Sequence, residues 1–333
     1  MDHSGELSAT PHYYSYDMEG LLCEKDEVFE AMTLSHTIFY PMVFILSLVG
    51  NSLVLWVLVK YESLESLTNT FILNLCLSDL VFSCLLPFWV VAHHYNWIFG
   101  EFLCKLLNML FSISLYSSII FLMVMTVHRY LSVVHPLSSL GGHSFRNRAW
   151  IISGIWVSSI LASVPDAIFH KVTSYESCDY SELRWFRLST YEHNLLFIFS
   201  LIVIVFCYVQ ILRTLFRSQS RRRHRTVRLI FTIVLAYFLS WAPYNVALFL
   251  KTLVNLPLLQ NCETNKQLEY AVQICKEIAF SHCCFNPVLY VFVGIKFRRH
   301  LKALFRHFWP LQRSLSPPPR SPGAFVYDDA SFY

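Results

Sequence analysis

The sequence predicts an all-α membrane protein: a seven-transmembrane helix bundle followed by an amphipathic eighth helix. The first observation is composition, since 55% of the 333 residues are hydrophobic and only 14% are charged, against about 25% charged in a soluble domain. The second is a set of seven stretches almost free of charge. The third is an unequal division of the remaining charges between the two ends of these stretches. Together they disfavour a soluble enzyme, a disordered chain and a nucleic-acid-binding protein.

The seven charge-poor stretches are long enough to cross a bilayer, which takes about 20 apolar residues in a helix. Lipid cannot satisfy the backbone groups of an isolated strand or loop, so each stretch is predicted to be a helix. The fourth stretch is short and is expected to extend towards Arg148, and Asp79 in the second is the one acid expected deep in a span. The stretches are 31–59, 66–100, 106–128, 149–165, 193–212, 229–250 and 278–295.

The charged residues orient the chain, because cytoplasmic segments carry an excess of Lys and Arg. With the C-terminus inside, 18 of the 26 basic residues and 4 of the 22 acidic residues are cytoplasmic, a charge of +14. The outer side then holds 8 basic and 17 acidic residues, a charge of −9. We therefore expect a multi-pass plasma-membrane protein with an extracellular N-terminus and an outer face that attracts a basic partner.

Four segments are expected along the chain. Residues 1–32 form an acidic, Tyr-rich extracellular N-terminus, and residues 33–294 form the bundle. Basic and apolar positions alternate at helical spacing over 295–308, which indicates an amphipathic helix on the inner leaflet of the lipid bilayer. The Pro- and Ser-rich residues 309–333 are expected to be a disordered cytoplasmic tail.

Four of the ten cysteines fall in or beside the outer segments, where disulfides persist. They are Cys23, Cys104, Cys178 and Cys262. Four cysteines allow three pairings. In a closed ring of helices the first and the seventh are neighbours, which favours the pairs Cys104–Cys178 and Cys23–Cys262.

Short motifs follow one another in order along the predicted helices. They are Gly50-Asn51, Leu75, Ser78-Asp79-Leu80, Trp97-Ile98-Phe99-Gly100, His128-Arg129-Tyr130, Trp156, Pro165, Tyr208, Trp241-Ala242-Pro243-Tyr244, Asn286-Pro287-Val288-Leu289-Tyr290 and Lys296-Phe297-Arg298. Each motif is weak alone, but in this order and spacing the chain resembles a rhodopsin-like G-protein-coupled receptor over about residues 33–308. The resemblance implies a receptor that is not an enzyme, needs no cofactor and signals through a heterotrimeric G protein.

Other features resemble the chemokine receptors within that family. They are the second cysteine pair, Ser281-His282-Cys283-Cys284 and Pro87-Phe88-Trp89. Residues 60–67, 178–183 and 330–333 are similar to receptors for XC-type chemokines (lymphotactin). The resemblance implies a basic chemokine ligand of XC type and the G protein Gi, with calcium mobilisation and chemotaxis. The alternative is a scavenging chemokine receptor that binds its ligand without G-protein coupling.

The ligand is expected to meet an acidic N-terminal segment and a pocket at the outer ends of the helices. The N-terminal segment comprises Tyr13, Tyr14, Tyr16, Asp17 and Glu19, where sulfation of the tyrosines would add negative charge, although a merely soluble acidic tail remains the alternative. Lys276 would suit an acidic or neutral group of the ligand, or would pair internally with Glu277 or Glu101. Aromatic and charged groups near the mouth are typical of ligand sites, and the expected set is Trp89, Phe111, Tyr116, Trp241, Tyr244, Lys276 and Glu277.

The activation switch is expected at the inner ends of the helices. In the family, Arg129 contacts the G protein and the residue before it is usually Asp, which pairs with the arginine. Here His128 cannot form that ion pair when neutral and would repel Arg129 when protonated, so we expect a weaker restraint on the inactive receptor. The prolines remove backbone hydrogen bonds and give hinges. The expected switch residues are His128, Arg129, Tyr130, Tyr208, Trp241, Pro243, Asn286, Pro287 and Tyr290.

Two further sites follow from the resemblance. Asp79, Ser118 and Asn286 match the positions that bind an allosteric sodium ion in the family, and the alternative is a protonated, hydrogen-bonded Asp79. The serines of the tail (Ser314, Ser316, Ser321 and Ser331) are candidates for receptor kinases and arrestin, or belong to a simple spacer.

Overall fold

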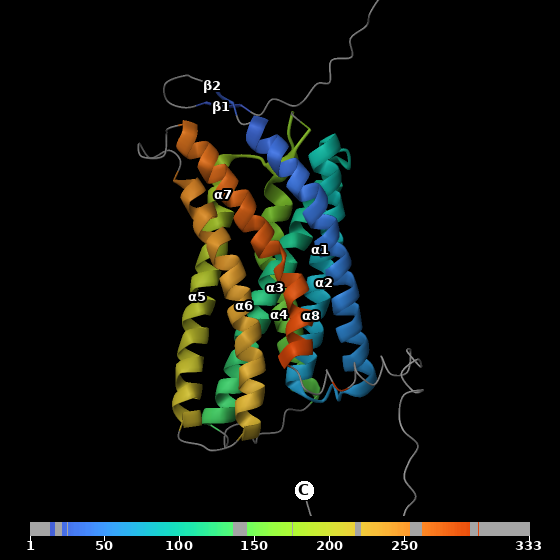
Figure 1. The fold of residues 1–333 in the computed structure, drawn as a ribbon, viewed down its shortest axis with the longest axis vertical. Coiled ribbons are helices and arrows are strands. Elements are labelled where there is room, and N and C mark those ends of the chain that lie inside the picture. The colour runs from blue at the N-terminus through green and yellow to red at the C-terminus, as the bar shows by residue number, and fades with distance from the viewer. Residues whose placement is uncertain are drawn as a thin grey trace, which may run out of the picture.

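A computed structural model describes residues 14–16, 22–24, 26–135, 145–174, 176–216, 221–253, 262–293 and 299. These residues form an elongated bundle of helices with two short hairpins at one end (Figure 1). The helices are α1 (Asp26–Tyr61), α2 (Leu67–Tyr95), α3 (Gly100–Val134), α4 (Phe145–Phe169), α5 (Leu183–Phe216), α6 (Arg221–Thr252), α7 (Cys262–Phe280) and α8 (His282–Val293). The strands are β1 (Tyr14–Tyr16), β2 (Leu22–Glu24), β3 (His170–Val172) and β4 (Cys178–Tyr180).

The predicted seven-helix bundle is confirmed. Within the described ranges six helices, α1 to α6, are long and apolar enough to cross a membrane. The seventh crossing is made by α7 and α8 together, interrupted by a turn at Ser281 (Figure 1). α8 is therefore the C-terminal half of the seventh crossing. The amphipathic helix expected over 295–308 is a different segment, and it lies outside the described residues except for Arg299.

Most helices extend beyond the charge-free stretches that predicted them, whereas α2 ends at Tyr95, before the end of the stretch 66–100. α4 runs from Phe145 to Phe169 instead of 149–165, and α5 begins at Leu183 instead of 193. The reason is physical: a helix continues past the hydrocarbon layer, where charged side chains such as Arg184 reach water. Counting uncharged residues finds the membrane layer and misses these outer turns.

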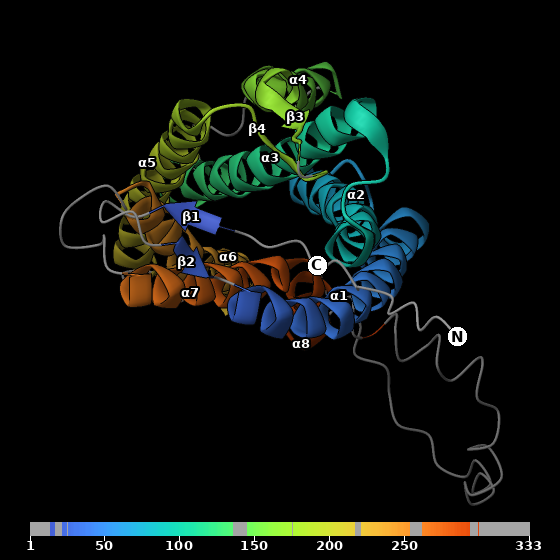
Figure 2. The same ribbon diagram turned by 90° about the horizontal axis from the view of Figure 1, so that it is seen from above.

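The centre of the bundle is packed around α3, which Figure 2 shows crossing between the other helices. Polar side chains tie neighbouring helices where lipid offers no partner. Trp156 on α4 donates a 2.9 Å hydrogen bond to Asn74 on α2, and Asn51 on α1 donates one of 2.9 Å to the carbonyl of Cys283. α1 also packs so closely on α8 that a Cβ at Gly50 would lie 2.9 Å from the ring of Pro287.

Both hairpins lie over the same end of the bundle (Figure 2). β3 and β4 pair antiparallel with His170 opposite Tyr180 and Val172 opposite Cys178. β1 and β2 pair antiparallel near the ends of α6 and α7. The side chains of β1 and β2 lie outside the described part of the chain, so of these four strands β3 and β4 supply the side chains of the site.

Candidate functional site

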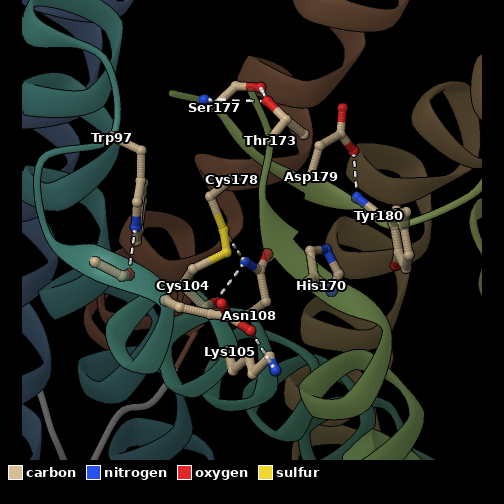
Figure 3. The surroundings of a disulfide bond; sticks show 12 residues. Trp97, Cys104, Lys105, Asn108, His170, Thr173, Ser177, Cys178, Asp179 and Tyr180 are labelled. Atoms are coloured by element: carbon tan, nitrogen blue, oxygen red, sulfur yellow. Dashed lines mark hydrogen bonds and ion pairs between the residues drawn. A yellow bond between two sulfur atoms is a disulfide. The ribbon is translucent and has the colours of Figure 1, made fainter. Parts of the chain in front are cut away.

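A disulfide fixes β4 above the N-terminal end of α3. Cys104, in the first turns of α3, is bonded to Cys178 at the start of β4, as the sequence predicts (Figure 3). Asn108 strengthens this junction, because its amide donates to the Cys104 carbonyl at 2.8 Å and to the Cys178 sulfur at 3.1 Å. Cys262 is also held in a disulfide. The side chain of Cys23, its expected partner, lies outside the described residues.

The hairpin end of the bundle, which is the predicted outer end, contains a cavity of about 230 Å³. Side chains from α2, α3, α5, α6 and α7 line it together with the β3–β4 hairpin. Five of the expected ligand residues are in this lining: Trp89, Phe111, Tyr116, Tyr244 and Lys276. The structure therefore brings together residues that lie as far apart in the sequence as α2 and α7.

The other expected ligand residues lie elsewhere. Trp241 is fully buried and packs against Tyr244, with ring centroids 6.0 Å apart, but it does not line the cavity. Glu277 faces α1, where its carboxylate accepts a 2.7 Å hydrogen bond from Ser35. Tyr13, Asp17 and Glu19 lie outside the described residues, as do the side chains of Tyr14 and Tyr16 in β1.

Lys276 is held by aromatic rings in place of an acid. Its ammonium nitrogen lies 5.8 Å from the ring centroid of Trp89 and 5.4 Å from that of Phe280, within the range of a cation–π interaction. Within the described part of the chain it makes no ion pair. The internal partners considered above are engaged elsewhere: Glu101 pairs with Lys105 at 2.7 Å, and Glu277 bonds Ser35. Lys276 therefore lines the cavity without an ion-pair partner among the described residues.

Asp166 is a site residue that the sequence reasoning missed. It follows the fourth charge-poor stretch directly, lies in the last turn of α4 and is only 3% exposed, so the structure contains a second buried acid besides Asp79. Its carboxylate accepts hydrogen bonds from Ser112 on α3, from the Tyr180 hydroxyl at 2.8 Å and from Ser189 on α5 at 3.1 Å. The sequence signal that could have indicated it is the position of this acid directly after the apolar stretch 149–165, because α4 continues through it to Phe169.

His170, the first residue of β3, is hydrogen-bonded to the backbone of the same residue, Asp166. The ring Nδ1 lies 2.7 Å from the Asp166 carbonyl oxygen, and a carbonyl can only accept, so Nδ1 carries the hydrogen. Burial lowers the pKa of His170, which keeps the ring neutral at pH 7. Burial, together with the charge of Asp166, raises the pKa of Tyr180, so its phenol keeps its proton. The ring centroids of His170 and Tyr180 lie 4.0 Å apart, and Figure 3 shows the two side chains next to each other.

Deeper in the bundle, Asp79 is hydrogen-bonded to Asn286, one of its two expected partners. Asn286 donates a 2.7 Å hydrogen bond to one carboxylate oxygen, whereas the Ser118 hydroxyl donates to Ser78 at 3.0 Å. The second carboxylate oxygen is buried without a hydrogen-bond partner and lies 3.6 Å from His282 Nε2. A buried carboxylate oxygen of this kind suits a small cation.

At the opposite end of the bundle, which is the predicted cytoplasmic end, Arg129 is held by a hydroxyl. Its guanidinium donates a hydrogen bond to Thr68 on α2, and it makes no ion pair within the part of the chain that the structure describes. Two other expected switch residues contact their neighbours: the Tyr130 hydroxyl lies 3.2 Å from His135 Nε2, and the ring centroids of Tyr208 and Phe231 lie 5.0 Å apart. Pro243 and Pro287 lie inside α6 and α8, while the Tyr290 side chain lies outside the described residues.

Comparison with known proteins gives the family. The family model "7 transmembrane receptor (rhodopsin family)" matches residues 50–290. The chain belongs to the rhodopsin family of seven-transmembrane receptors. It is 61% identical to chemokine XC receptor 1 of Homo sapiens over the whole of both chains. It is also 61% identical to chemokine XC receptor 1 of Mus musculus, over 98% of this chain and 99% of that one.

More distant relatives are receptors of the same kind. C-C chemokine receptor type 8 of Homo sapiens is 35% identical over 92% of this chain and 89% of that protein. The resemblance to chemokine receptors is thus confirmed, and this rhodopsin-family member is a G-protein-coupled chemokine receptor. It is a multi-pass plasma-membrane protein and a receptor, not an enzyme.

Proposed function

We propose that this receptor binds an XC-type chemokine at its extracellular face and signals through Gi. The observation that carries the proposal is the 61% identity, over the whole of both chains, to chemokine XC receptor 1 of Homo sapiens. The outer face supports it, because its excess of acidic residues would attract a basic chemokine over long range. The same distribution of charge supports an extracellular N-terminus.

The test is calcium release from cells that express the chain and are exposed to a panel of chemokines. The proposal expects an XC-type chemokine to release calcium and a block of Gi to remove the response. Binding without calcium release would support the scavenging alternative and contradict the proposal. A response to C-C chemokines alone would contradict the XC assignment, and cells without the receptor are the control.

We further propose that the cytoplasmic tail recruits arrestin after receptor kinases phosphorylate Ser314, Ser316, Ser321 or Ser331. Sulfation of Tyr13, Tyr14 and Tyr16 stays a prediction, as does the contribution of Asp17 and Glu19 to chemokine binding.

Sodium at Asp79 is the proposed allosteric ligand, held with Asn286 and Ser118. The support is the partnerless buried oxygen of Asp79, beside the amide of Asn286. A bound cation would neutralise this buried carboxylate and stabilise the folded receptor. We expect purified wild-type receptor to unfold at a higher temperature in sodium chloride than in choline chloride, and Asp79→Asn to unfold equally in both. Equal unfolding of the wild type in the two salts would contradict the proposal.

A further inference from the structure

The C-terminal end of α1 carries a lysine between two aromatic rings. The Lys60 ammonium nitrogen lies 4.9 Å from the ring centroid of Trp56 and 5.5 Å from that of Tyr61, within the range of a cation–π interaction. The two rings meet edge to face, with their centroids 5.5 Å apart. Lys60 is also the first charged residue after the charge-free stretch 31–59. Trp56, Lys60 and Tyr61 are named here the α1 cluster.

The α1 cluster faces away from the other helices. Trp56 and Tyr61 are 37% and 43% exposed, and Val59 is exposed as well, whereas Val57 is buried against the bundle. Figure 1 shows this end of α1 at the end of the bundle opposite the hairpins, and Figure 2 shows α1 at the edge of the bundle. Such a surface on a membrane-spanning helix contacts lipid. Trp, Tyr and Lys are the side chains typical of the level at which a helix passes the lipid headgroups.

The positive charge of Lys60 is oriented by the two rings and has no acidic partner among the described residues. A helix turns by about 100° per residue, so Glu62, two residues further on, projects from a different side. The α1–α2 connection with Glu65 is held towards α4, because Arg148 donates to the carbonyls of Leu64 and Glu65. Lys60 therefore brings its charge to the headgroup level facing the lipid.

The chemistry of the α1 cluster fits a phosphate group. An ammonium group can only donate, and the indole N–H and the phenol O–H can donate beside it, so phosphate oxygens suit all three. A choline headgroup fits less well, since its positive charge would meet that of Lys60. The ring faces that could bind a quaternary ammonium group already hold the lysine. The cytoplasmic leaflet, where this end of α1 is predicted to lie, is the one that contains anionic phospholipids.

We infer that the α1 cluster binds an anionic phospholipid of the cytoplasmic leaflet, with Lys60 on the phosphate and the rings of Trp56 and Tyr61 beside the glycerol and the first methylene groups. This goes beyond chemokine recognition, because it gives the receptor a lipid partner at the predicted cytoplasmic end of the bundle. A lipid satisfies both parts of the cluster. A free phosphate would leave the apolar ring surfaces without contact.

The experiment measures, by native mass spectrometry, how tightly the purified full-length receptor binds short-chain phosphatidylserine and phosphatidylcholine with the same chains. We expect the wild type to bind phosphatidylserine more tightly. Lys60→Met keeps the length of the side chain and should weaken phosphatidylserine binding about fivefold, the effect of one lysine at an anionic membrane surface, without changing phosphatidylcholine binding. Lys60→Arg keeps the charge and should bind as the wild type does.

Lys105→Met is the matched control. It also removes one lysine, but at the hairpin end of the bundle, where Lys105 pairs with Glu101 on α3, so it should bind both lipids as the wild type does. Glycerophosphoserine, the same headgroup without chains, should compete with phosphatidylserine only at a much higher concentration than the lipid itself.

Four results would overturn the inference. They are equal binding of the two lipids by the wild type, unchanged phosphatidylserine binding in Lys60→Met, an equal loss in Lys105→Met, and competition by glycerophosphoserine as strong as by the lipid. An equal loss in Lys105→Met would mean that net charge alone matters, and strong competition would mean that a free phosphate group suffices. The wild-type comparison and Lys60→Arg test the inference even if Lys60→Met folds poorly.

Discussion

Replacing both Cys104 and Cys178 with Ala is expected to weaken chemokine binding at least about 100-fold. The β3–β4 hairpin pairs over only three residues in each strand, and so short a hairpin is marginal in water. The disulfide anchors the first residue of β4, and Tyr180, which lines the cavity, is the last residue of that strand. Losing a native disulfide costs about 2–5 kcal/mol of folding free energy.

The measurement is binding of a labelled chemokine to membranes of known receptor content. Replacing both cysteines avoids an unpaired thiol. Cys84→Ser is the matched control, because Cys84 is free and exposed on α2, and it should bind as the wild type does. If the Cys104→Ala, Cys178→Ala receptor reaches the surface and binds within tenfold of the wild type, then the disulfide does not hold the site together.

The helices and the first disulfide were predictable from the sequence because the membrane leaves few alternatives. Backbone polar groups in lipid must be satisfied within the segment, so a long charge-free stretch can only be a helix. The closing of those helices into a ring then limits which outer cysteines can meet. Cys104 and Cys178 followed from this topology, and the structure pairs them.

The direction in which each side chain faces was less predictable. Lys276 and Glu277 are adjacent on α7 and both were expected in the pocket, yet only Lys276 lines the cavity. A helix turns by 100° per residue, so neighbours face different sides, and their surroundings depend on how the helix is rotated. Asp166 was misplaced for a related reason. Its donors, such as Ser112 and Tyr180, come from other elements that the sequence does not show as neighbours.

The C-terminal end of α3 shows what holds Arg129 where the family's Asp is replaced by His128. The guanidinium of Arg129 donates to the hydroxyl of Thr68, a neutral acceptor on α2. A hydrogen bond to a charged donor stabilises one arrangement by about 1.5–3 kcal/mol, and an ion pair in a partly buried site adds the attraction of a full opposite charge. The restraint on Arg129 is therefore present but incomplete, as the motif His128-Arg129-Tyr130 suggests.

Supplying the acid should therefore shift the receptor towards its inactive form. We expect His128→Asp to lower basal G-protein signalling and to raise the chemokine concentration needed for half-maximal response. A coupling of about 1–3 kcal/mol corresponds to a shift of about 5- to 150-fold. His128→Asn is the matched control, since it changes the residue without adding a charge and should signal as the wild type does.

Thr68→Val should act in the opposite direction and raise basal signalling, because it removes the acceptor that now holds Arg129. The measurement is nucleotide exchange on Gi at matched surface expression. Exchange without chemokine gives the basal signalling, and exchange at increasing chemokine concentrations gives the concentration for half-maximal response. If His128→Asp leaves both unchanged, the residue before Arg129 does not control its restraint.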